Sequence, residues 1–450
     1  MSQKQFKGSS LKRLLLSVSL FFIVGLAKPL APINFDVIKL QTNPNSPTLL
    51  LMGGIQGDEP GGFNATNIFL MHYKILDGNV WVVPVLNKHS MLLNHRGIYD
   101  DMNRKFATLS SSDPEYPIIK HIKELITSEE VNAILHLHDG SGFYRPVYEN
   151  ALLGPNRWGN CSIIDQEKLN GIKYGDLEEI VAQMIGHINQ KLLKPIHKYH
   201  IRDTHTAKGD KEMEKALTYF AIKNNKPAFA NEASKELPLE QRVYYHLLAI
   251  EGLLEQLGIS YEKDFNLNPK NLYYLINDKT LDVTVDENII LPLYGLRPTL
   301  NYFPLPKGIQ TSEIPLVSKA KIIGLLPKNN QIWLKYGNKL MTKINPDYME
   351  FDNSLKEITL KVDGKEKNFA VPSIIEVKEN FEILPLEGYR VNVIGYVIPG
   401  DKSLKPNESG IIIHKKECIP KFSIDKAGKI FRAEIYKGDK FSGMVLIKFL

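Results

Sequence analysis

The chain has 450 residues, of which 43% are hydrophobic and 24% are charged, and its formal net charge is +6. This length accommodates two to four domains, and the composition is that of a globular protein and excludes an intrinsically disordered one. The sequence contains no long stripe of Lys and Arg, which argues against nucleic acid as a partner.

The N-terminus has the pattern of a secretory signal peptide. Four basic residues and no acidic ones lie in residues 1–27, and an uncharged, mostly apolar run of 13 residues occupies 14–26. The run is too short to span a membrane comfortably, and Gly25 and Ala27 are the small residues that precede a cleavage site. We therefore expect a signal peptide at 1–27, with an uncleaved N-terminal anchor as the alternative. Its removal lowers the net charge from +6 to +2, and no other stretch of the sequence is apolar enough to suggest a membrane segment.

Residues 28–258 alternate strand-like and helix-like segments and are expected to form one α/β domain, with a mixed sheet flanked by helices. Apolar runs rich in β-branched residues predict strands; these are 35–40, 48–52, 80–86, 133–138 and 228–231. Helical spacing of apolar residues predicts helices over 176–193 and 238–257.

Helical periodicity is scarce after residue 258, and the remainder is expected to form two small, mainly β domains, 259–345 and 346–450. Residues 355–362 read as a strand that enters a tight hairpin at Asp363-Gly364. The division near residue 345 rests on the turn expected at 345–347. The two cysteines, Cys161 and Cys418, are expected to be free thiols in different domains.

A glycine-rich turn is the first segment that indicates chemistry. Residues 53–62 read Gly-Gly-Ile-Gln-Gly-Asp-Glu-Pro-Gly-Gly, directly after the strand at 48–52 and before a helix that Pro60 can open. Gln56 and Glu59 are three residues apart in this turn, so both side chains can point at one ion. The glycines allow backbone and substrate to approach closely.

A histidine pair is the second such segment. His136 and His138 lie two apart on the strand that ends at Asp139-Gly140, so they face the same side of the sheet. His138 stands at the strand end, where α/β sheets place their sites. One His, one Glu and one further ligand, with a fourth position open to water, is the pattern of a catalytic zinc site. His136 is expected beside the ligands.

Two further segments supply charged groups. Arg96 precedes the pair Asn103-Arg104 by seven residues, and a guanidinium is a planar fork suited to a carboxylate. Glu232 follows a short apolar strand, where a carboxylate near zinc-bound water can take its proton and pass it to a leaving amine. A solvated basic loop and a strand-end salt bridge are the alternatives.

Together these segments resemble the zinc metallocarboxypeptidases typified by pancreatic carboxypeptidase A, over residues 33–258. The resemblance implies that Gln56, Glu59 and His138 hold zinc. The family has His where this chain has Gln56, and a neutral carboxamide oxygen is a weaker donor than imidazole.

The same resemblance assigns the remaining roles. It implies that Asn103 and Arg104 bind the terminal carboxylate of the substrate, and that Arg96 polarises the scissile carbonyl and stabilises the oxyanion. It also implies that Glu232 is the general base.

A narrower resemblance accounts for the glutamine. The turn at 53–62, the loop Arg157-Trp-Gly-Asn160 and the β-rich tail are similar to the cell-shape-determining DL-carboxypeptidases of helical and curved bacteria. That family implies a Gln–Glu–His zinc site and a periplasmic enzyme that trims muramyl tripeptides of peptidoglycan to dipeptides, by releasing meso-diaminopimelate from D-Glu. Trp158 in this loop is either a surface for stacking of the substrate or a packed aromatic residue.

Two other functions remain open at this point. One is a zinc-dependent deacylase of N-acyl amino acids, which the signal peptide disfavours. The other is a non-catalytic scaffold that binds peptidoglycan, for which Gln56 is the best support. The sequence does not settle whether His205 or Tyr219 contributes to a site.

Overall fold

The structure is a computed structural model that describes residues 34–450, and the signal segment expected at 1–27 lies outside them. In the described residues no helix has the length and hydrophobicity needed to cross a membrane. Cys161 and Cys418 are both buried free thiols, as expected.

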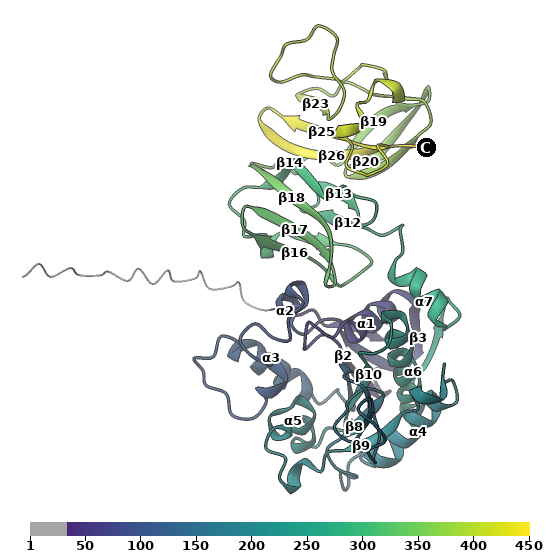
Figure 1. The fold of residues 1–450 in the computed structure, drawn as a ribbon. Helices are drawn as coiled ribbons and strands as arrows, with labels where there is room; N and C mark the ends of the chain where they lie inside the picture. The colour runs from purple at the N-terminus through teal and green to yellow at the C-terminus, as the bar shows by residue number, and fades with distance from the viewer. Residues whose placement is uncertain (1–33) are drawn as a thin grey trace, which may run out of the picture. The chain divides into compact units, whose positions relative to one another are not determined.

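A seven-stranded mixed sheet forms the centre of the first domain (Figure 1). In spatial order its strands are β1 (Ile38–Gln41), β4 (Asn79–Val83), β2 (Thr48–Met52), β5 (Ala133–Gly140), β10 (Ala228–Ser234), β8 (Cys161–Ile164) and β9 (His200–Asp203). The central β4, β2, β5 and β10 are mutually parallel, whereas β1 and the β8–β9 pair run in the opposite direction. The carboxyl ends of β2, β5 and β10 therefore meet at one edge of the sheet.

Helices cover both faces of this sheet, which explains why β2, β5 and β10 are buried along their whole lengths. Figure 1 shows α1 (Pro60–His72), α4 (Leu177–Asn189) and α6 (Leu239–Leu257) on one face, and α3 (Tyr116–Thr127) and α5 (Leu217–Lys223) on the other. The expected α/β architecture is thus confirmed, as are the strands predicted at 48–52 and 228–231 and both predicted helices.

The first domain extends beyond residue 258, where the sequence predicted its end. Strand β11 (Ser260–Lys263) pairs with β3 (Tyr73–Asp77), which follows α1. Helix α7 (Pro269–Ile276) places Leu272 and Ile276 in the core of this domain. The boundary therefore lies near residue 277, because these apolar side chains have their partners in the first domain.

The rest of the chain is β-rich, as predicted. The middle domain contains β12 (Asp282–Val285), β13 (Ile289–Pro292), β14 (Thr299–Pro306), β15 (Leu316–Val317), β16 (Ile323–Lys328), β17 (Gln331–Tyr336) and β18 (Lys339–Met349). The C-terminal domain contains β19 (Glu357–Val362), β20 (Lys365–Ala370), β21 (Ser373–Val377), β22 (Asn380–Ile383), β23 (Tyr389–Val393), β24 (Ile413–His414), β25 (Ile430–Lys437) and β26 (Lys440–Phe449). The hairpin at Asp363-Gly364 is confirmed, with both residues at positive φ.

The expected division at residue 345 is wrong. Residues 345–347 lie inside β18, where they continue its parallel pairing with β14 and form no turn. Phe441 and Met444 of the last strand also belong to the hydrophobic core of the middle domain. The two β domains therefore meet near residue 350 and share apolar packing.

Candidate metal centre

Gln56 and Glu59 lie in the connection from β2 to α1, where the sequence predicted them. Glu59 is the residue before the first turn of α1, and Pro60 opens the helix. The turn is tightly packed, since a Cβ on Gly57 would lie 2.0 Å from the carbonyl carbon of Ser90. Both side chains are buried as a result, and they point to the edge where β5 ends.

His138 faces this pair from β5. Its Nδ1 lies 2.8 Å from Gln56 Oε1 and 2.9 Å from Glu59 Oε2. One nitrogen and two oxygens thus converge from two segments 79 to 82 residues apart in the chain. Three buried donor atoms of this kind form a candidate site for a divalent metal, with one position left for water.

The second histidine sets the ring state of His138. His136 Nδ1 lies 2.7 Å from His138 Nε2, and His136 Nε2 lies 3.0 Å from Thr218 Oγ1. If His138 uses Nδ1 as a ligand, its Nε2–H donates to His136, which in turn donates to Thr218. Burial and the neighbouring His138 lower the pKa of His136 well below its usual value, which fits this neutral, relayed state.

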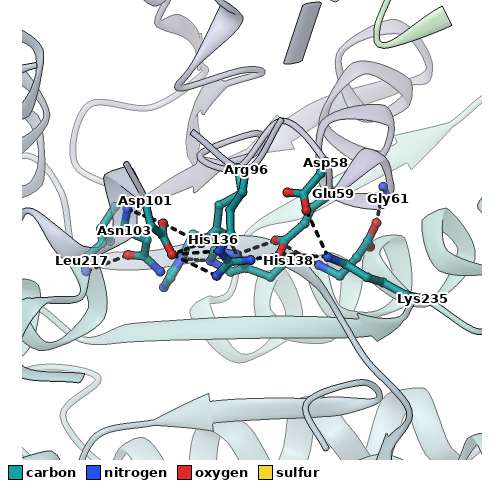
Figure 2. A network of polar contacts seen from close by, with 12 residues as sticks. Asp58, Glu59, Gly61, Arg96, Asp101, Asn103, His136, His138, Leu217 and Lys235 are labelled. Atoms are coloured by element: carbon teal, nitrogen blue, oxygen red, sulfur yellow. Dashed lines mark hydrogen bonds and ion pairs between the residues drawn. The ribbon is translucent and has the colours of Figure 1, made fainter. Parts of the chain in front are cut away.

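Asp101, which lies beside Arg96 in Figure 2, orients the amide of Gln56, a role that the sequence analysis missed. Gln56 Nε2 donates to both oxygens of Asp101, at 2.9 and 3.1 Å, so Oε1 must face His138. Arg96 donates through Nε to Asp101 and through Nη1 to Glu59, at 3.0 and 3.1 Å. Arg96 therefore fixes the positions of Asp101 and Glu59, and it also lines the cavity of the candidate site.

Asp139 at the end of β5 binds the connection between β2 and α1 to the sheet. Its Oδ2 accepts from Gly61 N at 2.8 Å and from Arg242 Nη1 at 2.8 Å, and its Oδ1 lies 3.2 Å from His246 Nε2. Burial alone raises the pKa of Asp139, but these partners outweigh it and hold the pKa below its usual value. The charge is therefore retained in the interior and keeps the start of α1 against β5.

Glu232 stands opposite His138, since the two residues are partners in the parallel pairing of β10 and β5. Among residues 34–450 its Oε2 has no hydrogen-bond partner, although the side chain is buried. Burial is the main cause that raises the pKa of Glu232 to about 8, while His138 opposes the shift. A carboxylate held in this way is a suitable proton acceptor for water bound at the ligand set.

Asn103 and Arg104 occupy the short 3-10 turn Met102–Arg104, after α2 (Lys88–Leu93). Asn103 Oδ1 accepts a hydrogen bond from Leu217 N at 3.0 Å, so the side-chain nitrogen of Asn103 points away from Leu217. Arg104 Nη1 donates to the carbonyl oxygen of Asn103 at 3.0 Å, and its Nε lies 4.0 Å from the exposed Glu212, a loose contact.

One cavity of about 240 Å³ brings together all seven predicted site residues. It is also lined by residues that the sequence analysis did not select, including Met213, Thr218 and Lys235. Lys235 directly follows β10 and lies 3.6 Å from Glu59 Oε1, and this position gave no signal in the sequence by itself. Trp158 lines this cavity and is covered by Arg202, 3.5 Å from the ring centre.

His205 and Tyr219 do not line this cavity. His205 is half-exposed and pairs with Asp203, 3.0 Å away. Within the described chain no cluster of three His, Cys, Asp or Glu side chains has the arrangement of a metal site. The candidate ligands described above include two residues of these types, His138 and Glu59, and the third ligand is the side-chain oxygen of Gln56. The number and the convergence of these three donors fit a divalent metal.

A metal centre at the carboxyl edge of a mixed α/β sheet, with a buried carboxylate opposite and an Asn-Arg pair in the same cavity, defines a metallocarboxypeptidase. Comparison with known families agrees over the whole described chain. The model described as "carboxypeptidase controlling helical cell shape catalytic" matches residues 12–277. The models described as the β-barrel domain and the C-terminal domain of such carboxypeptidases match 278–350 and 351–450.

Solved structures of Csd4 from Helicobacter pylori are similar over nearly the whole chain. The apo form of this cell shape determinant is 52% identical, with 93% of this chain and 100% of that chain covered, and a TM-score of 0.89. The mDAP-bound form, described as a D,L-carboxypeptidase, is 53% identical over 92% and 100%, also with a TM-score of 0.89. A tripeptide-bound form is 52% identical over 93% and 100%, with a TM-score of 0.88.

The comparison with curated proteins found no match. The family models and the identity to Csd4 nevertheless show the family. The chain belongs to the metallocarboxypeptidases that control helical cell shape.

Proposed function

We propose that this protein is a periplasmic zinc D,L-carboxypeptidase that trims muramyl tripeptides of peptidoglycan to dipeptides. The observation that carries the proposal is the convergence of Gln56, Glu59 and His138 opposite Glu232. The similar Csd4 structures with bound tripeptide and bound mDAP support a substrate that ends in meso-diaminopimelate.

Zinc is the metal that this donor set favours. It accepts nitrogen and carboxylate ligands in a four-coordinate site, and three protein ligands leave one position for water. When bound, zinc supplies a Lewis acid that lowers the pKa of water and polarises a carbonyl. The amide of Gln56 is neutral, so the net charge of the loaded centre is that of zinc and a single carboxylate.

Glu232 is proposed as the group that moves the proton. Its Oε2, which has no hydrogen-bond partner among residues 34–450, takes a proton from the attacking water and returns it to the leaving amine of the departing residue. Burial raises the proton affinity of the carboxylate, which suits the first of these two transfers.

The cationic and amide groups are proposed to bind the substrate. Asn103 and Arg104, which both line the cavity, bind the terminal carboxylate through their side-chain N–H donors. Arg96 stabilises negative charge on the carbonyl oxygen, with its orientation fixed by Asp101 and Glu59. A free carboxylate on the departing residue is therefore required, which makes the enzyme an exopeptidase.

Export of the protein to the periplasm is part of the proposal and is supported by the signal-peptide pattern at residues 1–27. Export also matches the proposed substrate, because peptidoglycan lies outside the cytoplasm.

The decisive experiment compares Glu232→Gln with wild type. The variant is expected to fold, bind zinc and lose about 100-fold to 10,000-fold in the rate of diaminopimelate release from purified muramyl tripeptide. Glu236→Gln, an exposed neighbour, is the matched control. Unchanged release by Glu232→Gln would contradict the assignment.

Two results with the wild-type protein would favour the alternative functions. A wild-type protein that takes up no zinc would favour a non-catalytic scaffold, and hydrolysis of N-acyl amino acids in place of muropeptide would favour a deacylase.

A further inference from the structure

A second, larger cavity lies between the two β domains. It encloses about 830 Å³ and is lined by the start of β14, the end of β18 and strands β23 and β25. The two domains are joined here, because Arg297 of the middle domain donates to the carbonyl oxygens of Ser423 and Pro420, each at 2.8 Å. The volume is in the range of small-ligand sites.

An aromatic side chain is held in solvent at this cavity by a strained backbone. Tyr302 has φ of 48° and is 82% exposed, although it lies within strand β14. Between Leu300 and Phe303 the pairing of β14 with β18 gains one residue, so Tyr302 is part of a bulge. Bulges and positive φ at a bulky residue cost free energy and re-aim side chains, and they are found where function requires them.

A buried arginine maintains this bulge. Arg432 is only 6% exposed, and its Nη1 and Nη2 donate to the carbonyl oxygens of Tyr302 and Asn301, at 3.2 and 3.3 Å. Its Nη1 also lies 3.1 Å from Oε1 of Glu434, which is 3% exposed. Within residues 34–450 the Nε of Arg432 has no hydrogen-bond partner. Because Arg432 lines the cavity, this incompletely satisfied side chain belongs to the cavity wall and requires an explanation.

The groups around the cavity determine the class of ligand. The lining carries three cationic residues, Arg297, Lys421 and Arg432, and two acidic ones, Asp347 and Glu434, so its charge is mixed with a net value of only +1. Buried charged groups of both signs offer donors and acceptors, as sugar hydroxyls require.

The rim adds apolar surface to these polar groups. Tyr302 and the exposed Phe422 give the lining aromatic surface on which the C–H face of a pyranose can pack, and Lys421 Nζ lies over the Phe422 ring, 4.8 Å from its centre. A neutral, polyhydroxylated ligand with one apolar face fits this combination.

We propose that this cavity is a subsite for the glycan strand of peptidoglycan, distinct from the metal centre. The assignment rests on the proposed function for its choice of glycan, since the wall polymer carries both the stem peptide and the sugar chain. Binding of the sugar chain keeps the protein on the polymer while successive stem peptides are presented to the first domain.

The test uses the purified full-length chain and a tetramer of N-acetylglucosamine, which contains no peptide. Calorimetric titration is expected to show binding by wild type and about a tenfold loss of affinity in Tyr302→Ala, since exposed aromatic anchors carry much of the binding energy. Phe422→Ala is expected to weaken binding in the same direction. Tyr274→Ala is the control, because Tyr274 is 61% exposed and does not line the cavity.

The outcomes are separable from those of the proposed function. No binding of the tetramer by wild type would overturn the subsite, as would equal affinity in wild type, Tyr302→Ala and Phe422→Ala. A third result would overturn the glycan subsite in favour of a peptide site. In that result a sugar-free stem peptide binds wild type, the tetramer does not, and Tyr302→Ala abolishes binding of the peptide. Hydrolysis of soluble tripeptide by wild type is measured in parallel, and its absence would contradict the carboxypeptidase proposal without affecting the titration.

Discussion

The side-chain amide of Gln56 donates two hydrogen bonds to the carboxylate of Asp101, at 2.9 Å to Oδ1 and 3.1 Å to Oδ2. An amide has one donor end and one acceptor end, so this contact fixes which end faces His138. A glutamine with a free side chain would present either end to a metal. Asp101 therefore turns the carboxamide oxygen towards His138, which is the orientation that the proposed role of Gln56 as a metal ligand requires.

Asp101→Asn is expected to weaken zinc binding. The asparagine amide offers Gln56 Nε2 a single oxygen, and Arg96 loses one of its two ionic partners, the other being Glu59. Loss of such a supporting contact typically lowers metal affinity about 10-fold to 100-fold. Competition with a chromogenic chelator measures the change. Asp100→Asn is the control, since Asp100 is exposed and its Oδ1 contact to Asp101 N survives in asparagine. Equal affinity in both variants would show that Asp101 does not position the ligand.

Zinc is expected to stabilise the protein through the three proposed ligands. A ligand that binds only the folded state at 100 times its Kd adds about 2.7 kcal/mol to the free energy of unfolding. The thermal midpoint of chelator-treated wild type should therefore rise when zinc is added. His138→Ala should lose this response, whereas His205→Ala, at an exposed histidine, should keep it. A response retained in His138→Ala would place the metal elsewhere.

Gly61→Ala is expected to destabilise the first domain. A Cβ at this position would lie 2.2 Å from Asp139 Oδ1 and would push the start of α1 away from β5. Overpacking of this kind costs about 1–3 kcal/mol. Gly186→Ala in α4 is the matched control, because its Cβ would meet nothing within 4 Å. That exchange should stabilise the helix by about 0.5–1 kcal/mol. Urea unfolding followed by circular dichroism compares the two, and a loss of similar size in both would contradict the clash.

Glu251 is expected to make the stability depend on acid pH. Burial raises its pKa, but contacts from His187, Lys263 and Tyr73 outweigh burial and lower the pKa to about 2. The stabilisation is complete above the unfolded value of 4.5 and is lost as the pH falls from there towards 2. The full shift corresponds to about 3 kcal/mol.

Glu251→Gln tests this dependence. The variant should be less stable than wild type at pH 7 and should lose less stability between pH 5 and pH 3, as measured by urea unfolding midpoints. Glu255→Gln on the same helix is the control, since Glu255 is largely exposed. A wild-type slope retained in Glu251→Gln would assign the acid sensitivity to other groups.

Local patterns predicted the parts of the site that lie next to strand ends. Parallel strands place their carboxyl ends at one edge, so the turn after β2, the end of β5 and the end of β10 had to meet once the strands were recognised. Gln56, Glu59, His138 and Glu232 follow from this rule. Asp101 and Thr218 do not, because each lies in an irregular or short element whose partners are far away in the sequence.

Domain boundaries were less predictable for a related reason. The helix Pro269–Ile276 was not singled out in the sequence, and its buried face finds its partners only in the first core. The Asn-Pro-Asp segment at 345–347 has the composition of a turn, yet pairing with β14 keeps it extended. Hydrogen-bonded pairing with a neighbouring strand therefore overrides the local preference of a segment for a turn.

The sequence by itself determined the residue types of the metal centre, the alternation of strands and helices that brings them to one edge, and the β-rich character of the tail. It did so because strand periodicity and strand-end chemistry are local properties. Only the tertiary structure decided that Asp101 orients Gln56 and that Arg432 holds the bulge at Tyr302 beside a cavity. It also decided that Glu232 pairs with His138 while its Oε2 has no hydrogen-bond partner among residues 34–450. These relationships join segments far apart in the chain, and their energies exist only after the chain has folded.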